Sequence, residues 1–123
     1  MKFARIVFIA AGVWGFAIVT PLYFTLDLVG RSYPPPIAHA DIYYGFVGVT
    51  LVWQLAFLLI ATNPARYRRI MIAAILEKIV YVTSMVALYL QGRIQTGQVA
   101  VAGPDFVLAL LFVAAFIKTP EQR

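Results

Sequence analysis

Four long apolar stretches divide this chain, and short polar segments separate them. The stretches are residues 6–26, 42–62, 70–90 and 99–117. The first two contain no charged residue, whereas the third carries Glu77 and Lys78 and the fourth carries Asp105. A helix needs about 20 apolar residues to span the hydrocarbon of a bilayer. The pattern therefore predicts four membrane-spanning helices.

The expected helices cover roughly residues 4–27, 41–62, 66–91 and 99–118. The connections between them are short and no internal repeat is visible, so residues 1–123 should form a single transmembrane domain. Helices joined by short connections pack as antiparallel neighbours. The predicted fold is all-α: a polytopic membrane protein built as an antiparallel, up-down four-helix transmembrane bundle.

Several residues mark where these helices should begin, bend or end. Pro21 should kink the first helix, because proline leaves the carbonyl four residues earlier without its partner. Asp41 stands where an N-cap belongs, and Gly92 stands where helices commonly stop. Small residues should let helices approach neighbours closely, within the bundle rather than against a partner subunit. They are Ala11, Gly12 and Gly15 on the first helix and Gly45 and Gly48 on the second.

Prolines should shape two further segments of the chain. The triple proline at 34–36 predicts an extended strap over one end of the bundle. In the fourth helix, Gly103-Pro104-Asp105 interrupts the apolar run. Either residues 99–102 are also helical with a break at the proline, or the protein thins the bilayer at this helix.

Composition and charge agree with a membrane location. Hydrophobic residues make up 63% of the 123 residues and charged residues 12%, with a mean hydropathy of +0.87. Seven basic residues fall at the ends of the helices that should share one side with the termini: Lys2, Arg5, Arg66, Arg68, Arg69, Lys118 and Arg123. The opposite loops hold only Arg31 and Arg93. This bias predicts cytoplasmic termini, and it explains the net charge of +5 without a nucleic-acid partner.

The residue inventory excludes several kinds of chemistry. The chain has no cysteine and a single histidine, which excludes disulfides, thiol nucleophiles, iron–sulfur clusters and two-histidine metal motifs. No glycine-rich phosphate loop or nucleophile elbow is present. We therefore expect no metal or cofactor, and neither an energy-coupled pump nor an enzyme of the soluble type.

Polar residues inside the second and third helices give the best indication of a site. Read outward from the turn at Ala65–Arg66, Gln54 and Glu77 lie at the same depth of a helical hairpin, and Thr50 and Tyr81 share the next level. Ionisable groups within a membrane face the bundle interior and mark functional sites by default. Gln54, Glu77 and Tyr81 could instead form a structural hydrogen-bond clamp, or they could be the floor of a ligand pocket or a proton-accepting site.

Lys78 and Trp53 form a further expected level of this hairpin. Lys78 lies about 100° round the helix from Glu77, so the two side chains should not face each other. We expect Lys78 to extend toward the cytoplasm or to stack on Trp53, which adds Trp53 to the candidate ligand-binding residues.

A second polar group should gather at the other end of the bundle. It consists of Asp27, His39, Asp41 and Asp105. Helix capping explains Asp41 and Asp105, and a metal or proton site is the alternative.

In length and topology, the chain resembles the DoxX-like group of small four-span bacterial membrane proteins, which implies a bacterial inner membrane. Residues 21–27, Pro-Leu-Tyr-Phe-Thr-Leu-Asp, and residues 51–55 through 60–62 are similar to the EXPERA group of sterol isomerase and sigma-2 receptor relatives. That resemblance implies Asp27 as one acid facing a sterol-sized cavity. Thr50 occupies the place of a second acid, which argues against isomerase chemistry.

Three functional hypotheses follow. The first is a non-catalytic accessory or assembly subunit that packs against a larger membrane complex and has no substantial cavity. The second is a binding protein or carrier for a quinone, isoprenoid or sterol-like molecule held beside Gln54 and Glu77. The third is an intramembrane enzyme that uses Glu77 or Asp27 as a proton shuttle.

Overall fold

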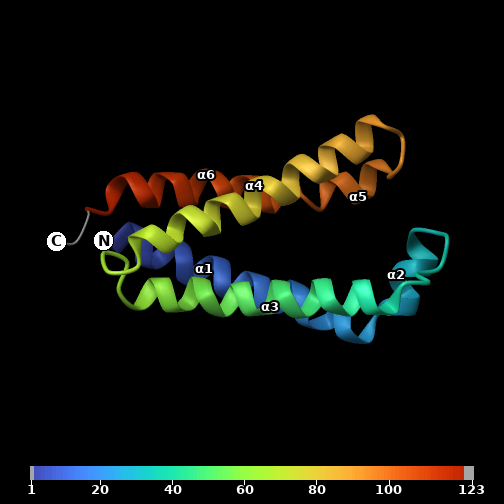
Figure 1. Ribbon diagram of the computed structural model, residues 1–123, viewed down its shortest axis with the longest axis horizontal. Coiled ribbons are helices and arrows are strands. Elements are labelled where there is room, and N and C mark those ends of the chain that lie inside the picture. Colours follow the sequence, from blue (N-terminus) through green and yellow to red (C-terminus); the bar gives the residue numbers. More distant parts are fainter. Residues whose placement is uncertain (1, 121–123) are drawn as a thin grey trace.

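The computed structural model describes residues 2–120 and is helical throughout its long segments (Figure 1). Its elements are α1 (Lys2–Val19), the 3₁₀ helix η1 (Thr20–Phe24), α2 (Leu26–Ser32), α3 (Ala40–Thr62), α4 (Arg68–Leu90), α5 (Thr96–Ala100) and α6 (Gly103–Lys118). Four spans are long and apolar enough to cross a membrane: Lys2–Phe24, Ala40–Thr62, Arg68–Leu90 and Thr96–Lys118. The prediction of an all-α, up-down bundle of four membrane spans is confirmed.

The four spans pair as two helical hairpins. α1 packs along α3 and α4 packs along α6, while α1 also contacts α6 and α3 touches α4 only sparsely. The hairpins lie together at the end that holds the termini and separate toward the end that holds α2 and α5 (Figure 1). The molecule is therefore tightly packed in one half and divided in the other.

Three phenylalanines fill the packed half. The ring of Phe8 from α1 stacks on Phe112 from α6 at 4.4 Å between centroids, and Phe57 from α3 meets Phe112 edge-on at 5.0 Å. All three side chains are fully buried. Small residues around them, including Ala4, Ala11, Ala74 and Ala115, let the helix backbones approach this aromatic core.

Most of the remaining apolar surface faces outward. Only 17% of the apolar stretch of α4 is buried within the molecule, and the other spans reach at most 33%. Large aliphatic side chains such as Ile6, Leu59 and Ile117 are more than half exposed. Exposed apolar surface of this extent requires a hydrocarbon solvent, so this is a multi-pass membrane protein.

Glycines set the contact between α1 and α3. A side chain at Gly12 would meet Leu58, and one at Gly15 would collide with Gln54. The prediction that these two glycines allow close packing inside the bundle is confirmed. The same prediction is wrong for Gly45, where nothing lies within 4 Å of an added Cβ, whereas a Cβ at Gly48 would lie 3.0 Å from the Tyr23 hydroxyl.

Several element boundaries differ from the prediction. α1 ends at Val19, and the chain continues through Pro21 as a 3₁₀ helix, because proline cannot donate the α-helical hydrogen bond. The predicted first loop contains the short helix α2, and residues 33–35 bend instead of forming a straight strap. His39 rather than Asp41 is the N-cap of α3, and Asp41 lies in the first turn.

The other two boundary predictions have clear outcomes. Gly92 ends α4 with a positive φ of 72°. The Gly92 amide donates to the Tyr89 carbonyl and the Arg93 amide to the Leu88 carbonyl, which is the Schellman pattern. In the fourth span, residues 96–100 are helical and a turn precedes Pro104, so the alternative with a proline break is correct.

Basic residues gather at the packed end. Arg68 donates from Nε to the Thr119 carbonyl at 2.7 Å, and its guanidinium lies 3.8 Å from the centre of the Phe116 ring. Lys118 lies 4.2 Å from the centre of the Phe3 ring. Arg123, which contributes to the predicted charge bias, lies outside the described residues.

Candidate functional site

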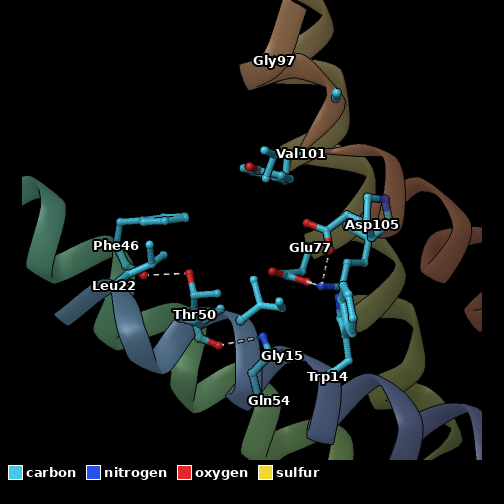
Figure 2. Close-up of a pocket in the computed structure, with 16 residues that line it drawn as sticks. Trp14, Gly15, Leu22, Phe46, Thr50, Gln54, Glu77, Gly97, Val101 and Asp105 are labelled. Atoms are coloured by element: carbon cyan, nitrogen blue, oxygen red, sulfur yellow. Dashed lines mark hydrogen bonds and ion pairs between the residues drawn. The ribbon is translucent and has the colours of Figure 1, made fainter. Parts of the chain in front are cut away.

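A cavity of about 510 Å³ occupies the half of the molecule where the two hairpins separate. Residues from every membrane span line it (Figure 2). Aliphatic side chains line it from both hairpins, among them Ile18, Leu22 and Val101. Trp14, Phe46 and Tyr81 add aromatic surface, and the polar floor consists of Gln54, Glu77, Lys78 and Asp105.

Lys78 is the centre of the polar floor. Its ammonium donates to Asp105 Oδ1 at 3.0 Å and lies 3.6 Å from Glu77 Oε2. The Lys78 side chain is only 5% exposed, and its nitrogen lies 5.2 Å from the centre of the Phe57 ring. The Lys78 ammonium thus forms ion pairs with both the Glu77 and the Asp105 carboxylates, at the boundary between the aromatic core and the cavity.

This arrangement corrects the prediction for Lys78. The side chain does not extend toward the basic end, it has no stacking contact with Trp53, and it does pair with Glu77. The reason is Asp105, which the first turn of α6 places within reach of the ammonium. A buried lysine without a partner is unfavourable, whereas an ion pair with a second helix lets it remain inside.

Two buried oxygen atoms of the polar floor lack a hydrogen-bond donor. Gln54 is 1% exposed, and its Nε2 donates to the Thr50 carbonyl one turn earlier at 2.9 Å. That bond leaves Gln54 Oε1 buried and without a partner, and Glu77 Oε2 likewise accepts no hydrogen bond from the described residues. An unsatisfied buried acceptor costs about 1–3 kcal/mol. The protein itself encloses both atoms, since Gln54 Oε1 lies against Gly15 and Glu77 Oε2 lies 3.6 Å from the Lys78 ammonium.

The position of Gln54 depends on Gly15. The amide side chain lies directly against the α1 backbone at Gly15, where a Cβ atom would overlap it. Since Gly15 has no side chain, Gln54 can lie flat between α1 and α3 at the edge of the cavity. The close approach of α1 and α3 at Gly15 therefore fixes the position of the Gln54 amide.

The structure brings together three of the five predicted ligand-binding residues. Gln54, Glu77 and Tyr81 all line the cavity. Trp53 instead packs against the core, with its ring 6.2 Å from that of Phe57. Asp27 lies in the first turn of α2, away from the residues that line the cavity.

The predicted hydrogen-bond clamp does not form. Within residues 2–120, no hydrogen bond joins Gln54, Glu77 and Tyr81 to one another. The Tyr81 ring instead stacks with Phe46 of α3 at 6.5 Å between centroids. Gln54 of α3 and Glu77 and Tyr81 of α4 instead line the cavity, and α3 and α4 touch each other only sparsely.

Asp105 does not join the predicted outer polar group of Asp27, His39 and Asp41. Asp105 turns inward to Lys78, while Asp41 lies in the first turn of α3 and Asp27 in α2. Among the described residues, no group of three or more histidine, aspartate and glutamate side chains could hold a metal ion.

Sequence reasoning missed Trp14 and Asp105 as cavity residues. The mid-span position of Trp14 in the first apolar stretch predicts a core residue rather than an interfacial one, yet Trp14 is 47% exposed and lines the cavity. Asp105 is the only charged residue in the fourth apolar stretch. A search for the cation that such an intramembrane acid requires would have paired it with Lys78.

Residues from both hairpins meet at the outer end of the cavity. The Tyr33 hydroxyl, from the segment after α2, approaches Gly97 of α5 so closely that a Cβ there would lie 3.2 Å from it. The Tyr89 and Thr96 hydroxyls, 3.3 Å apart, tie α5 to α4. Gly97 itself lines the cavity, so the segment after α2 reaches its rim.

No protein family, curated protein or solved structure matches this chain. The resemblances to the DoxX-like and EXPERA groups therefore stay predictions. What the site can do must be argued from its own geometry.

Proposed function

We propose that this protein is a non-catalytic membrane protein that binds a lipophilic molecule with a polar head in the cavity between its two hairpins. The observation that carries the proposal is a cavity of about 510 Å³ that residues from all four spans line, with the partly exposed carboxylates of Glu77 and Asp105 on its polar floor. That volume is typical of small-molecule sites. The polar head of a bound ligand can meet these carboxylates, whose side chains are 21% and 25% exposed.

The setting determines how such a site gains affinity. A ligand that leaves the bilayer exchanges lipid tails for the aliphatic side chains of Ile18, Leu22 and Val101, and the two environments are equally apolar. The polar floor must therefore supply most of the preference for the site. The ligand should place its head at Glu77 and Asp105 and its apolar body along the aliphatic side chains.

The accessory-subunit hypothesis has less support. It expects a bundle without a substantial cavity, and the cavity argues against it. The exposed aliphatic side chains of the spans suit acyl chains as well as another subunit. The third hypothesis, an intramembrane enzyme, stays a prediction. No residue of the site is given a role in a chemical step here.

The variant Glu77→Gln tests the proposal. It keeps the shape of the side chain and removes its charge, so it should weaken ligand binding while the fold stays intact. The protein is extracted with its native lipids into polymer nanodiscs and examined by native mass spectrometry. We expect wild-type protein to retain a lipophilic molecule in stoichiometric amount and Glu77→Gln to lose most of it.

The matched control is Asp41→Asn, which removes a carboxylate from the exposed first turn of α3, outside the cavity. It should retain the ligand as wild type does. If Glu77→Gln and Asp41→Asn retain the same molecules in the same amounts, or if wild type carries only bulk lipid, the proposed function is wrong. Stoichiometric co-purification of another membrane chain would favour the accessory subunit.

We infer from the charge bias that both termini and the connection between α3 and α4 are cytoplasmic. Because the chain has no cysteine, single cysteines report topology without background. Ala65→Cys lies in that connection and Ala38→Cys in the exposed segment before α3. In intact cells, a membrane-impermeant maleimide should label the cysteine at position 38 and spare the one at 65. The opposite labelling would contradict the inferred orientation.

A further inference from the structure

We infer that a groove between α1 and α3, at the packed end of the molecule, binds an anionic phospholipid, with the lipid phosphate at Arg5 and one acyl chain along Ile9 and Leu58. This α1–α3 groove has a volume of about 350 Å³, and its lining consists of Arg5, Ile9, Leu58, Ala61 and Thr62. None of these residues lines the cavity between the hairpins. The inferred site is therefore separate from the site of the proposed function.

The polarity of the α1–α3 groove changes along its length. Arg5 lies one turn nearer to the start of α1 than Ile9, and Thr62 is the last residue of α3. Because α1 and α3 run in opposite directions (Figure 1), Arg5 and Thr62 lie at the same end of the groove. Ile9 and Leu58 each lie four residues farther into the membrane, about 6 Å at 1.5 Å per residue. A phospholipid has the same order of groups, with a charged head at the membrane surface and apolar chains beneath it.

The packing of α1 against α3 gives the groove a floor and an inner end. Ala61 is 3% exposed and its short side chain leaves a depression between the helices, whereas Ile9 at the rim is 45% exposed. Farther into the membrane, the Leu58 side chain lies against α1 at Gly12, where a Cβ would come within 2.6 Å of it. The groove is thus open toward the bilayer and short, and a flexible acyl chain can follow it.

Arg5 provides the charge complementarity for a phosphate. With the residues from 2 to 120, Arg5 makes no ion pair, hydrogen bond or ring contact. Neighbouring cations are engaged within the protein, since Arg68 contacts the Thr119 carbonyl and Lys118 lies over the Phe3 ring. A guanidinium can bind a phosphate through two parallel hydrogen bonds. Arg5 is therefore available to a lipid headgroup at the mouth of the groove.

The surroundings of Arg5 also favour an anion. The acidic residues of the chain are Asp27, Asp41, Glu77, Asp105 and Glu121. The first two lie in the first turns of α2 and α3, at the opposite end, and the next two lie at the cavity. Glu121 lies outside the described residues. Among residues 2–120, the packed end thus carries basic side chains without acidic ones, and basic sites between membrane helices bind anionic headgroups.

Native mass spectrometry of the complete, delipidated protein in detergent tests the inference. Phosphatidylglycerol and phosphatidylcholine with identical acyl chains are titrated separately, and each gives a dissociation constant for the first bound lipid. A basic residue near the membrane surface contributes about fivefold to the binding of an anionic lipid. We therefore expect wild type to prefer phosphatidylglycerol about fivefold. Glycerol phosphate, which has the anionic group without the acyl chains, should show no binding.

Two charge variants locate the headgroup. Arg5→Gln should lower the affinity for phosphatidylglycerol about fivefold and remove the preference over phosphatidylcholine. The matched control is Arg66→Gln, which removes one positive charge from the same end but lies outside the groove. It should keep the preference. Both arginines are exposed, so neither substitution should impair folding.

Two further variants locate the acyl chain. Ile9→Trp places a large ring at the rim of the groove and should weaken the binding of both lipids. Its control is Ile6→Trp, at a position that is 61% exposed and outside the groove. That control should bind both lipids as wild type does.

Several results would overturn the inference. Equal losses in Arg5→Gln and Arg66→Gln would show that the basic end attracts lipids diffusely. Binding of glycerol phosphate as tight as that of the lipid would show a simple anion site, and unchanged binding to Ile9→Trp would place the acyl chain elsewhere. A second protein chain that occupies the groove and excludes lipid would also contradict it. The proposed function is tested by Glu77→Gln at the cavity, so either can fail without the other.

Discussion

Lys78 is the residue on which the polar floor depends. It lies between the carboxylates of Glu77 and Asp105, and its side chain is almost fully buried. Removing one partner of a buried ion pair leaves an uncompensated charge, which costs more than the pair contributes. At this position the loss would leave two carboxylates together in an apolar setting.

The variant Lys78→Met should therefore lower the free energy of unfolding by about 3 kcal/mol. The double variant Lys78→Met/Asp105→Leu should recover most of that loss, because it replaces the pair with apolar side chains of similar size. Reversible unfolding in mixed detergent micelles measures both. Equal stability of Lys78→Met and wild type would show that the ion pair is unimportant for the fold.

Single residues also show how far the sequence can be interpreted. The hairpin register places Gln54 and Glu77 at one depth, and the structure has both at the cavity. The partner of Lys78 could not be predicted in this way, because Asp105 lies on α6, outside the α3–α4 pair that the register describes. Whether Asp105 reaches Lys78 depends on how α6 packs against α4. A long flexible side chain can reach partners on any neighbouring helix, whereas sequence spacing gives only the relative positions of residues on one helix.

At the scale of helices, the contact between α1 and α3 positions the amide of the site. Gly15 leaves the space that Gln54 occupies, and Gly12 leaves the space beside Leu58. Small residues at helical spacing indicate a close contact in a membrane. They do not indicate which side chain fills the space, and for that reason the sequence could not link Gly15 to Gln54.

The variant Gly15→Ala should destabilise the protein by about 1–3 kcal/mol, because the added methyl group overlaps the Gln54 side chain and must displace it. The control is Gly45→Ala, where nothing lies within 4 Å of the new atom. It should be neutral or slightly stabilising, since alanine favours helices more than glycine does. The unfolding assay described for Lys78 compares the two, and equal effects would contradict the assigned contact.

The end of the fourth span shows another limit at this scale. The Gly103-Pro104-Asp105 sequence allowed either a broken helix or a thinned bilayer, and the structure has the short helix α5 before the break. The apolar character of residues 99–102 is compatible with both alternatives, so the sequence could not decide between them. In the structure, α5 contacts α4, and the Tyr89–Thr96 hydroxyl pair is one of these contacts.

At the scale of the whole molecule, the two hairpins meet over an aromatic core and separate around a cavity (Figures 1 and 2). The sequence predicts four antiparallel spans because length and hydropathy determine them. It does not predict the separation, since a residue that faces lipid and a residue that faces an apolar cavity have the same character. Only the polar residues indicated the position of the site, because polar side chains are unfavourable in contact with lipid and therefore face the interior.

The central claim is that this interior space, rather than the lipid-facing surface, receives the ligand. Photolabelling with a lipophilic probe that carries a polar head and a diazirine tests it most directly, with the labelled residues identified by mass spectrometry. Labels should concentrate on Trp14, Phe46, Glu77 and Val101. The variant Leu22→Trp, which narrows the cavity, should reduce them. Labels distributed over outward-facing residues such as Ile6, Leu59 and Ile117, and unaffected by Leu22→Trp, would contradict the account.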